Sequence, residues 1–459
     1  MVVRAGRGAR GRRAVEWVET RLGTPLRLIP VGFAAAVAVA TLVLMSPWAT
    51  ADGSSAPFLV AVFTATSAVC VTGHIVVDTP VYWSTAGEAA ILLFVQLGGL
   101  GVATLATLLA LLVARKVGLQ DRLRAAAGTS ADALADARAV VLGIVTTSLV
   151  IEVVVAVCLS LRFWLGYGEP PGRALWLGVF HSVSAFNNAG FSLFSDNLVG
   201  FDDDAWVTGP VMVAVVLGGI GFPVLREVLR RHRPGRWSVH TRLTLLTTGV
   251  LLLLGALVFV VLEWQHEPTS GDGSVADRLW IPLFMSVTAR TAGFNTIDYG
   301  QATEASLFVT NLLMIVGGGS GGTAGGIKVG TLAVLVAAVV AEARGDSDTD
   351  VMGRRVPPQV LRQALAVLAL TLAVVVTAST VLLRIADATT AQVVFEVVSA
   401  TATVGLSTGI TADLPALGKW VLIVCMFVGR IGPVALVSAL ALRDRSKLYR
   451  LPETRPLIG

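Results

Sequence analysis

The sequence predicts an all-α integral membrane protein made of four pseudo-symmetric helix–loop–helix repeats. Three observations predict this fold class: a low content of charged residues, eight long apolar stretches, and a glycine-containing segment that recurs four times. Of the 459 residues, 54% are hydrophobic and 14% are charged, and the mean hydropathy is +0.76. A soluble domain carries about 25% charged residues. Too few charges remain to cover a water-soluble surface of this size, which argues against a soluble enzyme and excludes a disordered chain.

Eight apolar stretches are long enough to cross a bilayer, whose hydrocarbon core requires about 20 residues of helix. They cover residues 28–45, 89–114, 139–161, 207–225, 243–262, 306–340, 364–383 and 420–442. Three of them contain a charged side chain. The third carries Glu152, the sixth is interrupted by a glycine-rich run that ends in Lys328, and the eighth carries Arg430.

The basic residues predict the orientation of these spans. The two tails and the connections 115–138, 226–242 and 341–363 together hold 27 Lys and Arg, whereas the four alternate connections hold 6. By the positive-inside rule, a multi-pass protein of the cell membrane with both termini in the cytoplasm is expected. The net charge of +5 therefore reflects topology. Contact with membrane lipid is a secondary interpretation, and no nucleic-acid partner is predicted.

Each outward connection contains a short apolar stretch followed by a polar segment that ends in glycine. The four stretches, at about 56–68, 174–186, 279–290 and 391–401, are too short to span a membrane. The segments that follow read VCVTGH, FNNAGF, RTAGFN and ATVGLS. A Phe precedes the glycine of each segment by ten residues, or by nine in the third. This internal repeat predicts eight transmembrane helices and four re-entrant half-helices.

The four segments are predicted to line a central cation pore. Non-helical backbone at membrane depth is tolerated where it is buried or lines a water-filled cavity. Four such loops around one axis would form a ring of carbonyl groups that replaces the hydration shell of a monovalent cation. Glycine is required because inward-pointing carbonyls demand backbone angles that are costly for other residues. The predicted filter residues are Val71, Thr72, Gly73, Asn188, Ala189, Gly190, Thr291, Ala292, Gly293, Thr403, Val404 and Gly405.

From residue 28 to residue 445, nearly all of the chain resembles the Trk/Ktr/HKT superfamily of potassium transporters, most closely the Ktr-type potassium-translocating membrane subunit. The most specific strings are FHSVSAFNNAGFS (180–192), TARTAGFNT (288–296), GGGSGGTAGGIK (317–328), ATVGLSTG (402–409) and FVGRIGP (427–433). The Trk-type relatives carry two additional N-terminal helices, which favours the Ktr type here. The four filter glycines match the family. His74 departs from it, since leucine is common at that position, and this puts the outer mouth in question.

The resemblance implies uptake of potassium, held by the backbone carbonyls of the filter, with coupling to sodium left open. Gly73 favours potassium, because serine in the first loop accompanies sodium selectivity in the plant branch. The resemblance also implies a homodimer and a separate cytoplasmic regulatory subunit that binds ATP or ADP. The chain itself is expected to bind no cofactor.

The glycine-rich run at 317–328 is predicted to be an intramembrane gate below the filter, at the position of the family's gating loop. Seven glycines in twelve residues oppose a helix interior, at about 1 kcal/mol each relative to Ala. A charge at the bilayer centre costs about 3 kcal/mol, so Arg430 is expected to hold carbonyls of the closed loop. A tight helix crossing and a helix-packing ion pair remain open alternatives. The predicted gate residues are Gly317, Gly318, Gly319, Ser320, Gly321, Gly322, Thr323, Ala324, Gly325, Gly326, Lys328 and Arg430.

The predicted organisation follows the repeats. It comprises a basic cytoplasmic tail at 1–27, repeat 1 at 28–138, repeat 2 at 139–238, repeat 3 with its gating loop at 239–358, repeat 4 at 359–445 and a cytoplasmic tail at 446–459.

Several polar residues lie near the predicted filter in the sequence. Arg290 is expected to pair with Glu396 behind the filter. His181 is expected to be a hydrogen-bonded buried residue rather than a metal ligand. Glu152 is expected to have a hydrogen-bonded structural role, with ion coupling as the alternative. The amides of Asn187 and Asn188 are candidates for supporting the filter from behind.

Other function classes fit the sequence less well. A sodium-permeable or channel-like monovalent cation transporter shares the same filter argument. The potassium-binding subunit of an ion pump shares the four-loop design but has further helices. An intramembrane enzyme would need paired carboxylates or a His/Asp constellation, whereas the spans offer only isolated charges. No catalytic residue is therefore predicted.

Overall fold

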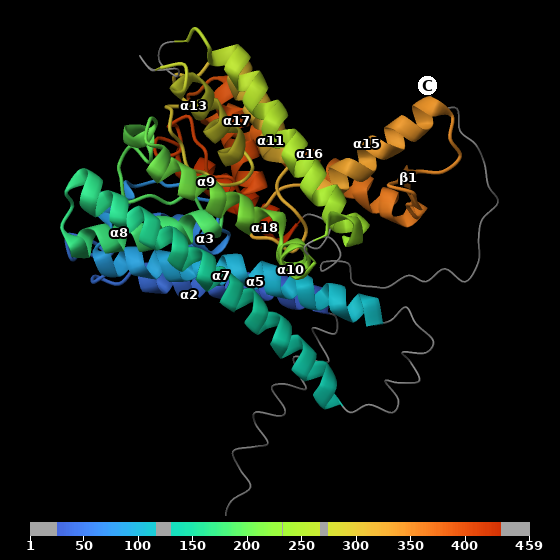
Figure 1. The fold of residues 1–459 in the computed structure, drawn as a ribbon. Helices are drawn as coiled ribbons and strands as arrows, with labels where there is room; N and C mark the ends of the chain where they lie inside the picture. Colours follow the sequence, from blue (N-terminus) through green and yellow to red (C-terminus); the bar gives the residue numbers. More distant parts are fainter. Residues whose placement is uncertain (1–24, 116–129, 232, 267–273, 433–459) are drawn as a thin grey trace, which may run out of the picture.

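The computed structural model describes residues 25–115, 130–231, 233–266 and 274–432, and its regular structure is almost entirely helical (Figure 1). The α-helices, in chain order, are α2 (Pro25–Leu44), α3 (Phe58–Val69), α4 (Thr79–Tyr82), α5 (Thr85–Arg115), α7 (Ser130–Tyr167), α8 (Pro171–Phe186), α9 (Ala205–Ile220), α10 (Phe222–Arg230), α11 (Val239–Glu263), α13 (Asp277–Thr288), α14 (Glu304–Ile315), α15 (Val329–Arg344), α16 (Pro358–Ile385), α17 (Thr390–Ala402) and α18 (Ala416–Ile431). Two 3-10 turns, at Val199–Phe201 and Pro234–Arg236, lie in connections. The helical content agrees with the predicted class.

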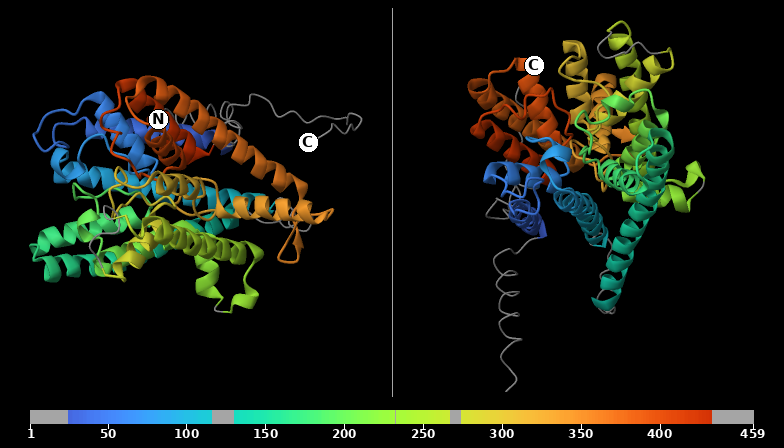
Figure 2. Two further views of the ribbon diagram at one scale, coloured as in Figure 1. Left: turned by 90° about the horizontal axis from the view of Figure 1, so that it is seen from above. Right: turned by 90° about the vertical axis from the view of Figure 1, so that its left-hand side faces the viewer.

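Four sets of helices surround a common centre. Each set has one long helix (α2, α7, α11 or α16), one short helix (α3, α8, α13 or α17) and a closing helix (α5, α9, α14 or α18). In the right panel of Figure 2 the four sets lie in four quadrants, coloured blue, green, yellow and orange-red. Successive sets touch through α5 and α7, α9 and α13, α14 and α17, and finally α18 and α3. The last contact closes the arrangement.

The short helices coincide with the predicted short apolar stretches. Each contains the phenylalanine that recurs before the glycine, and all four phenylalanines are at most 2% exposed: Phe63, Phe180, Phe284 and Phe395. Local sequence starts these helices. Pro171 occupies the first position of α8, and Thr389 and Gln392 form a capping box at α17. A buried aromatic in each helix then fixes its depth in the core.

By length and composition, three of the described helices can cross a membrane: Ala139–Tyr167 within α7, α11 and α16. The pair α9–α10 adds a fourth span bent by 100° at Gly221. The apolar stretch predicted at 207–225 is therefore divided between two helices. Gly221 has φ +97°, and a Cβ there would lie 2.6 Å from the carbonyl oxygen of Ser320. The glycine-rich run packs against this point, so only a glycine fits and the helix turns.

The sixth and eighth predicted spans differ from single complete helices. The sixth is split into α14 and α15 by residues 316–328, as the glycine-rich run predicts. In the eighth, α18 ends at Ile431, and residues 433–442 lie outside the described part. The second repeat's long helix α7 begins at Ser130, before the predicted boundary at 138/139. A two-stranded antiparallel hairpin, β1 (Asp350–Val351) with β2 (Arg354–Arg355), is a small addition to the all-α prediction.

Candidate functional site

The four glycine-containing segments share one unusual backbone conformation. In each, the first residue of the triplet and its glycine have positive φ, while the middle residue does not. The values are Val71 55° and Gly73 90°, Asn188 58° and Gly190 69°, Thr291 71° and Gly293 78°, and Thr403 51° and Gly405 98°. Alternation between left- and right-handed backbone directs successive N–H groups to one side and the carbonyl groups to the other. Each segment thus presents a row of carbonyls.

The four segments meet in a closed ring. A Cβ added to each glycine would collide with the carbonyl oxygen of the middle residue of the next segment. The distances are 2.3 Å from Gly73 to Ala189, 2.8 Å from Gly190 to Ala292, 2.3 Å from Gly293 to Val404 and 2.1 Å from Gly405 to Thr72. The fourth contact returns to the first segment. The structure therefore brings all twelve predicted filter residues together, in chain order around one axis.

A hydroxyl in each short helix supports the ring from behind. Ser67 and Ser399 accept hydrogen bonds from the backbone N–H of Gly73 and Gly405, at 3.0 and 3.1 Å. In the other two repeats, Ser184 donates to the carbonyl of Phe191 at 2.7 Å, and Thr288 donates to that of Phe294. The short helices also point their C-terminal ends at the ring. Because that end of a helix carries partial negative charge, it favours a cation there.

The third segment has a different backbone hydrogen bond from the others, in agreement with its shorter spacing between Phe and glycine. In three repeats the backbone N–H of the middle residue bonds the carbonyl five residues earlier, as Thr72 does with Ser67 at 2.8 Å. In the third, Ala292 bonds Thr288, four residues earlier, at 2.9 Å. This repeat has the spacing of nine rather than ten between Phe and glycine. One residue fewer in the segment is absorbed by a tighter turn.

An outer cavity opens onto the ring. Its volume is about 760 Å³, and its lining includes Gly73, Gly190 and Gly405. Asp78, Asp196 and Asp298 also line it, together with several hydroxyl and amide side chains. Carboxylates at the mouth of a low-dielectric funnel raise the local concentration of cations.

Glu396 does not pair with Arg290, so this prediction is wrong. The Glu396 carboxylate lies 2.9 Å from Nε2 of His74, the residue after the first filter glycine. It also accepts hydrogen bonds from Ser407 Oγ at 2.5 Å and from the Thr408 N–H at 2.9 Å. Both His74 and Glu396 are buried. The pair joins the first segment to the fourth short helix, which are neighbours only because the ring closes.

The glycine-rich run contacts the ring through Thr323. The Thr323 hydroxyl is 3.1 Å from the carbonyl of Phe186 and donates to Oδ1 of Asn188 at 2.9 Å. Its backbone N–H donates to Gly218 at 3.1 Å. Nη1 of Arg430 donates to the Thr323 carbonyl at 2.5 Å, and Nη2 to that of Gly98 at 3.0 Å.

Two further cations hold carbonyls of this run. Nη2 of Arg290 donates to the Gly317 carbonyl at 2.6 Å, and Nζ of Lys328 donates to that of Ala324 at 2.6 Å. Within the described residues, neither they nor Arg430 have a carboxylate partner. Buried charges require compensation. Backbone carbonyls supply it here, and the run is thereby held in one position.

A second glycine in each of three repeats lets the closing helix approach the end of a short helix. A Cβ on Gly98, Gly218 or Gly429 would lie 1.9 to 2.0 Å from the carbonyl oxygen of Val69, Phe186 or Thr401, respectively. In the third repeat, Gly317 packs instead against Gly325 of its own run. The recurrence of these glycines after the filter is a sequence signal of this close approach.

The other polar residues occupy supporting positions. His181 is buried, with its ring nitrogens 2.8 Å from the carbonyl of Leu177 and 3.0 Å from Ser192 Oγ, as expected of a hydrogen-bonded core residue. Glu152 accepts a hydrogen bond from Gln96 at 2.9 Å. Asn187 donates to the same Gln96 at 2.6 Å. The sequence does not predict Gln96 as a partner of Glu152, nor Arg290 as a partner of the glycine-rich run. Nothing in the sequence near either residue indicates which distant residue it contacts.

A family model described as TrkH, cation transport protein, matches residues 31–447. The chain belongs to this family. Ktr system potassium uptake protein B of Bacillus subtilis is 36% identical over 97% of this chain and 99% of its own length. Potassium/sodium uptake protein NtpJ of Enterococcus hirae is 34% identical over 95% and 97%. The crystal structure of the potassium transporter TrkH from Vibrio parahaemolyticus has a TM-score of 0.70 at 20% identity, over 91% of this chain and 84% of that one, and shows the same fold.

Membership of the TrkH family confirms the resemblance predicted from the sequence. It makes the chain a cation transport protein of the membrane and not an enzyme.

Proposed function

We propose that the chain mediates potassium uptake across the cell membrane through the ring of four glycine segments. The closed contact between each glycine and the next segment's carbonyl is the observation that carries this proposal. Rows of carbonyls held at such a ring can replace the hydration shell of a cation. The relatives from B. subtilis and Vibrio alginolyticus are named for potassium uptake, which supports potassium as the ion, and the E. hirae relative is named for potassium/sodium uptake.

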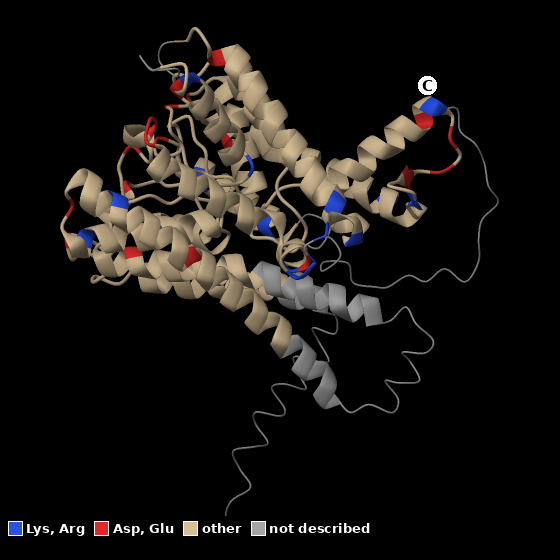
Figure 3. Ribbon diagram, in the orientation of Figure 1, with Lys and Arg blue, Asp and Glu red and all other residues tan. Residues whose placement is uncertain are grey.

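The glycine-rich run is proposed as the gate of this pathway. Thr323 contacts the ring, and the buried Arg290 and Arg430, together with the half-buried Lys328, hold carbonyls of the run. The cytoplasmic face is proposed for this side, because the basic connections flank it (Figure 3). Residues 28–445 would then form four repeats, each contributing one quadrant of the pore.

A homodimer and a separate cytoplasmic subunit that binds ATP or ADP are proposed as partners. The name of the B. subtilis relative describes protein B of a Ktr system, which supports further components. The cytoplasmic connections of this chain are too short for a nucleotide-binding domain of their own.

Rubidium uptake into proteoliposomes, measured with and without sodium, tests the proposal. Uptake is expected to exceed that of protein-free vesicles and to be inhibited more strongly by external potassium than by external sodium. Stimulation by sodium would indicate coupling. Equal inhibition by both ions would instead favour the sodium-permeable alternative. The E. hirae relative is named for uptake of both ions. Absence of uptake in every condition would contradict the transport proposal.

A further inference from the structure

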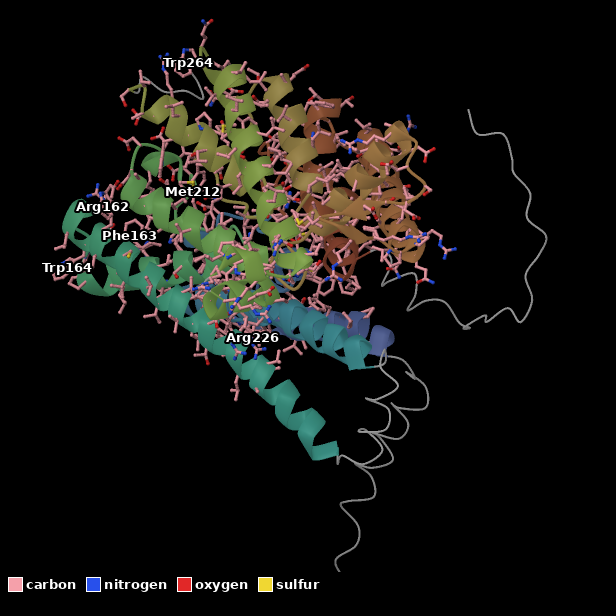
Figure 4. All side chains as sticks on the ribbon, turned by 45° about the vertical axis from the view of Figure 1, so that its right-hand side comes forward. Arg162, Phe163, Trp164, Met212, Arg226 and Trp264 are labelled. Atoms are coloured by element: carbon pink, nitrogen blue, oxygen red, sulfur yellow. The ribbon has the colours of Figure 1, made fainter. Side chains whose placement is uncertain are left out.

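A groove outside the ring lies between the inner half of α7 and the short helix α10. Its volume is about 540 Å³. Its α7 wall includes Ala139, Gly143 and Thr147, and its α10 wall includes Phe222, Arg226 and Arg230. Figure 4 labels Arg226 beside α7, away from Arg162. None of these residues takes part in the ring or the glycine-rich run.

The bend at Gly221 creates this groove. It turns α10 by 100° from the axis of α9. Phe222, Val224 and Leu225 are buried against the protein, while Arg226 and Arg230 are exposed. On the facing wall, a Cβ on Gly143 would meet no atom within 4 Å. A small residue opposite a turned helix therefore leaves an apolar channel open to the surroundings.

The two arginines at the groove have no partner among the described residues. Among the described residues, Arg226 and Arg230 make no hydrogen bond or ion pair, whereas their neighbour Arg231 pairs with Glu227 at 3.3 Å. They are four residues apart on a helix, so they lie on one face. The groove thus combines an apolar channel with two guanidinium groups that have no partner in the described part of the chain.

We propose that the groove binds one anionic phospholipid of the cytoplasmic leaflet. Its acyl chain lies along the Gly143 wall, and Arg226 and Arg230 bind its phosphate. A guanidinium fork matches phosphate oxygens in geometry and charge. Basic side chains at the cytoplasmic surface attract anionic lipid headgroups. The assignment rests on the proposed orientation of the chain and not on which ion it transports.

The site is linked to the glycine-rich run through the backbone. The N–H of Phe222, which lines the groove, donates to the carbonyl of Gly321 at 3.2 Å. A lipid that restricts the movement of α10 therefore also restricts Phe222, which is hydrogen-bonded to the run. This contact makes cation flux a second readout of lipid occupancy.

Native mass spectrometry of the full-length protein tests the site, with phosphatidylglycerol and phosphatidylcholine as probes. The double variant Arg226→Gln/Arg230→Gln is expected to bind phosphatidylglycerol about tenfold more weakly, because each basic residue contributes to attraction of the headgroup. The matched control Arg233→Gln/Arg236→Gln removes two exposed arginines outside the groove and should change binding less than about twofold.

A second variant, Gly143→Leu, tests the acyl channel with both charges retained. The open space at this position tolerates the side chain, so folding should be preserved. Loss of phosphatidylglycerol binding in both variants supports the proposal. Unchanged phosphatidylglycerol binding in both variants would overturn it. So would an equal loss of phosphatidylcholine binding, which would show that the headgroup is not recognised. A change in the oligomeric state of the variants would also overturn it, because the groove would then be an interface between copies.

Discussion

At the scale of single residues, the ring stores backbone strain at non-glycine positions. Val71, Asn188, Thr291 and Thr403 all have positive φ, and three of the four are β-branched. Such a conformation costs about 1–2 kcal/mol per residue. Hydroxyls of the short helices and contacts with the neighbouring segment hold it in place. Strain repeated at four equivalent positions indicates a shared functional requirement.

Replacing Gly73 with serine is expected to reduce discrimination of potassium from sodium. The new Cβ would lie 2.3 Å from the Ala189 carbonyl oxygen and would displace one quarter of the ring. The ratio of potassium to sodium inhibition of rubidium uptake measures the effect. Gly53→Ser is the control, since Gly53 also has positive φ but lies in open space. An unaltered ratio in folded Gly73→Ser would remove this segment from the filter.

His74→Leu is expected to lower the free energy of unfolding by about 1–3 kcal/mol, because the buried Glu396 carboxylate loses one of its partners. Thermal unfolding in detergent measures this loss. His74→Gln keeps a donor near Glu396 and should recover part of it. Equal stability of wild type and His74→Leu would show that the contact contributes nothing.

At the scale of elements, the glycine-rich run is positioned by contacts at both of its ends and in its middle. Arg290 binds its first carbonyl, Arg430 the carbonyl of Thr323, and Lys328 those of Ala324 and Gly325. Glycines alone would leave the run without a preferred position. A two-state element is biased only by contacts that differ between its states. The three cations are the groups that can supply that difference.

Arg430→Ala is expected to raise passive rubidium flux about tenfold, because hydrogen bonds from a charged donor contribute about 1.5–3 kcal/mol each. Deletion of Ser320 to Thr323 should act in the same direction by removing the contact with the ring. Flux through purified protein without partner subunits measures both. Arg344→Ala, at the exposed end of α15, is the matched control. Folded variants that conduct no more than wild type would place the gate elsewhere.

Asp204 joins the C-terminal end of α7 to the start of α9 and gives a pH prediction. It accepts hydrogen bonds from Trp206 N–H, Arg162 Nε and Tyr167 Oη at 2.8 to 2.9 Å. Burial raises the pKa of this carboxyl, but the hydrogen bonds from Arg162 and Tyr167 outweigh burial and bring the pKa below its usual value. The ionised form is thus favoured by folding. Its contribution is full above about pH 4 and is lost as pH falls through the lower folded pKa.

Asp204→Asn should therefore lower the free energy of unfolding by about 1–2 kcal/mol at pH 7, because hydrogen bonds to a charged acceptor contribute more than those to a neutral amide, with a smaller difference near pH 3. Thermal unfolding at the two pH values is the measurement. Asp203→Asn, an exposed neighbour, is the control. A difference from wild type that does not shrink on acidification would refute the assignment of the charge.

At the scale of the whole molecule, the four quadrants place their short helices toward the same end. The short helices, the outer cavity and the acidic loops lie toward one end, and the basic connections and the lipid groove lie toward the other (Figures 1 and 3). Such an asymmetry follows from the repeat, because each unit places its short helix on the same side of the membrane.

Single cysteines are expected to report this direction. In a background of Cys158→Ser, with the remaining cysteines buried, Asp203→Cys should react with an impermeant thiol reagent from outside intact cells. Asp346→Cys should react only after permeabilisation. Both positions are exposed, so accessibility within the protein is matched. Reversed labelling would overturn the orientation and, with it, the lipid assignment.

The sequence by itself determined the membrane class, the four recurring glycine segments and the helix break at the glycine-rich run. Apolar length and glycine density are read from neighbouring residues, and the repeat is read by comparing segments of the same chain, so none of these needs a known tertiary contact. Tertiary structure alone decided the bend at Gly221 and the partners of the buried polar groups. Arg290 binds Gly317 rather than Glu396, and Glu396 binds His74, 322 residues away in the chain. The partner of a buried charged group depends on which quadrants pack together, because only residues of adjacent quadrants come within hydrogen-bonding distance.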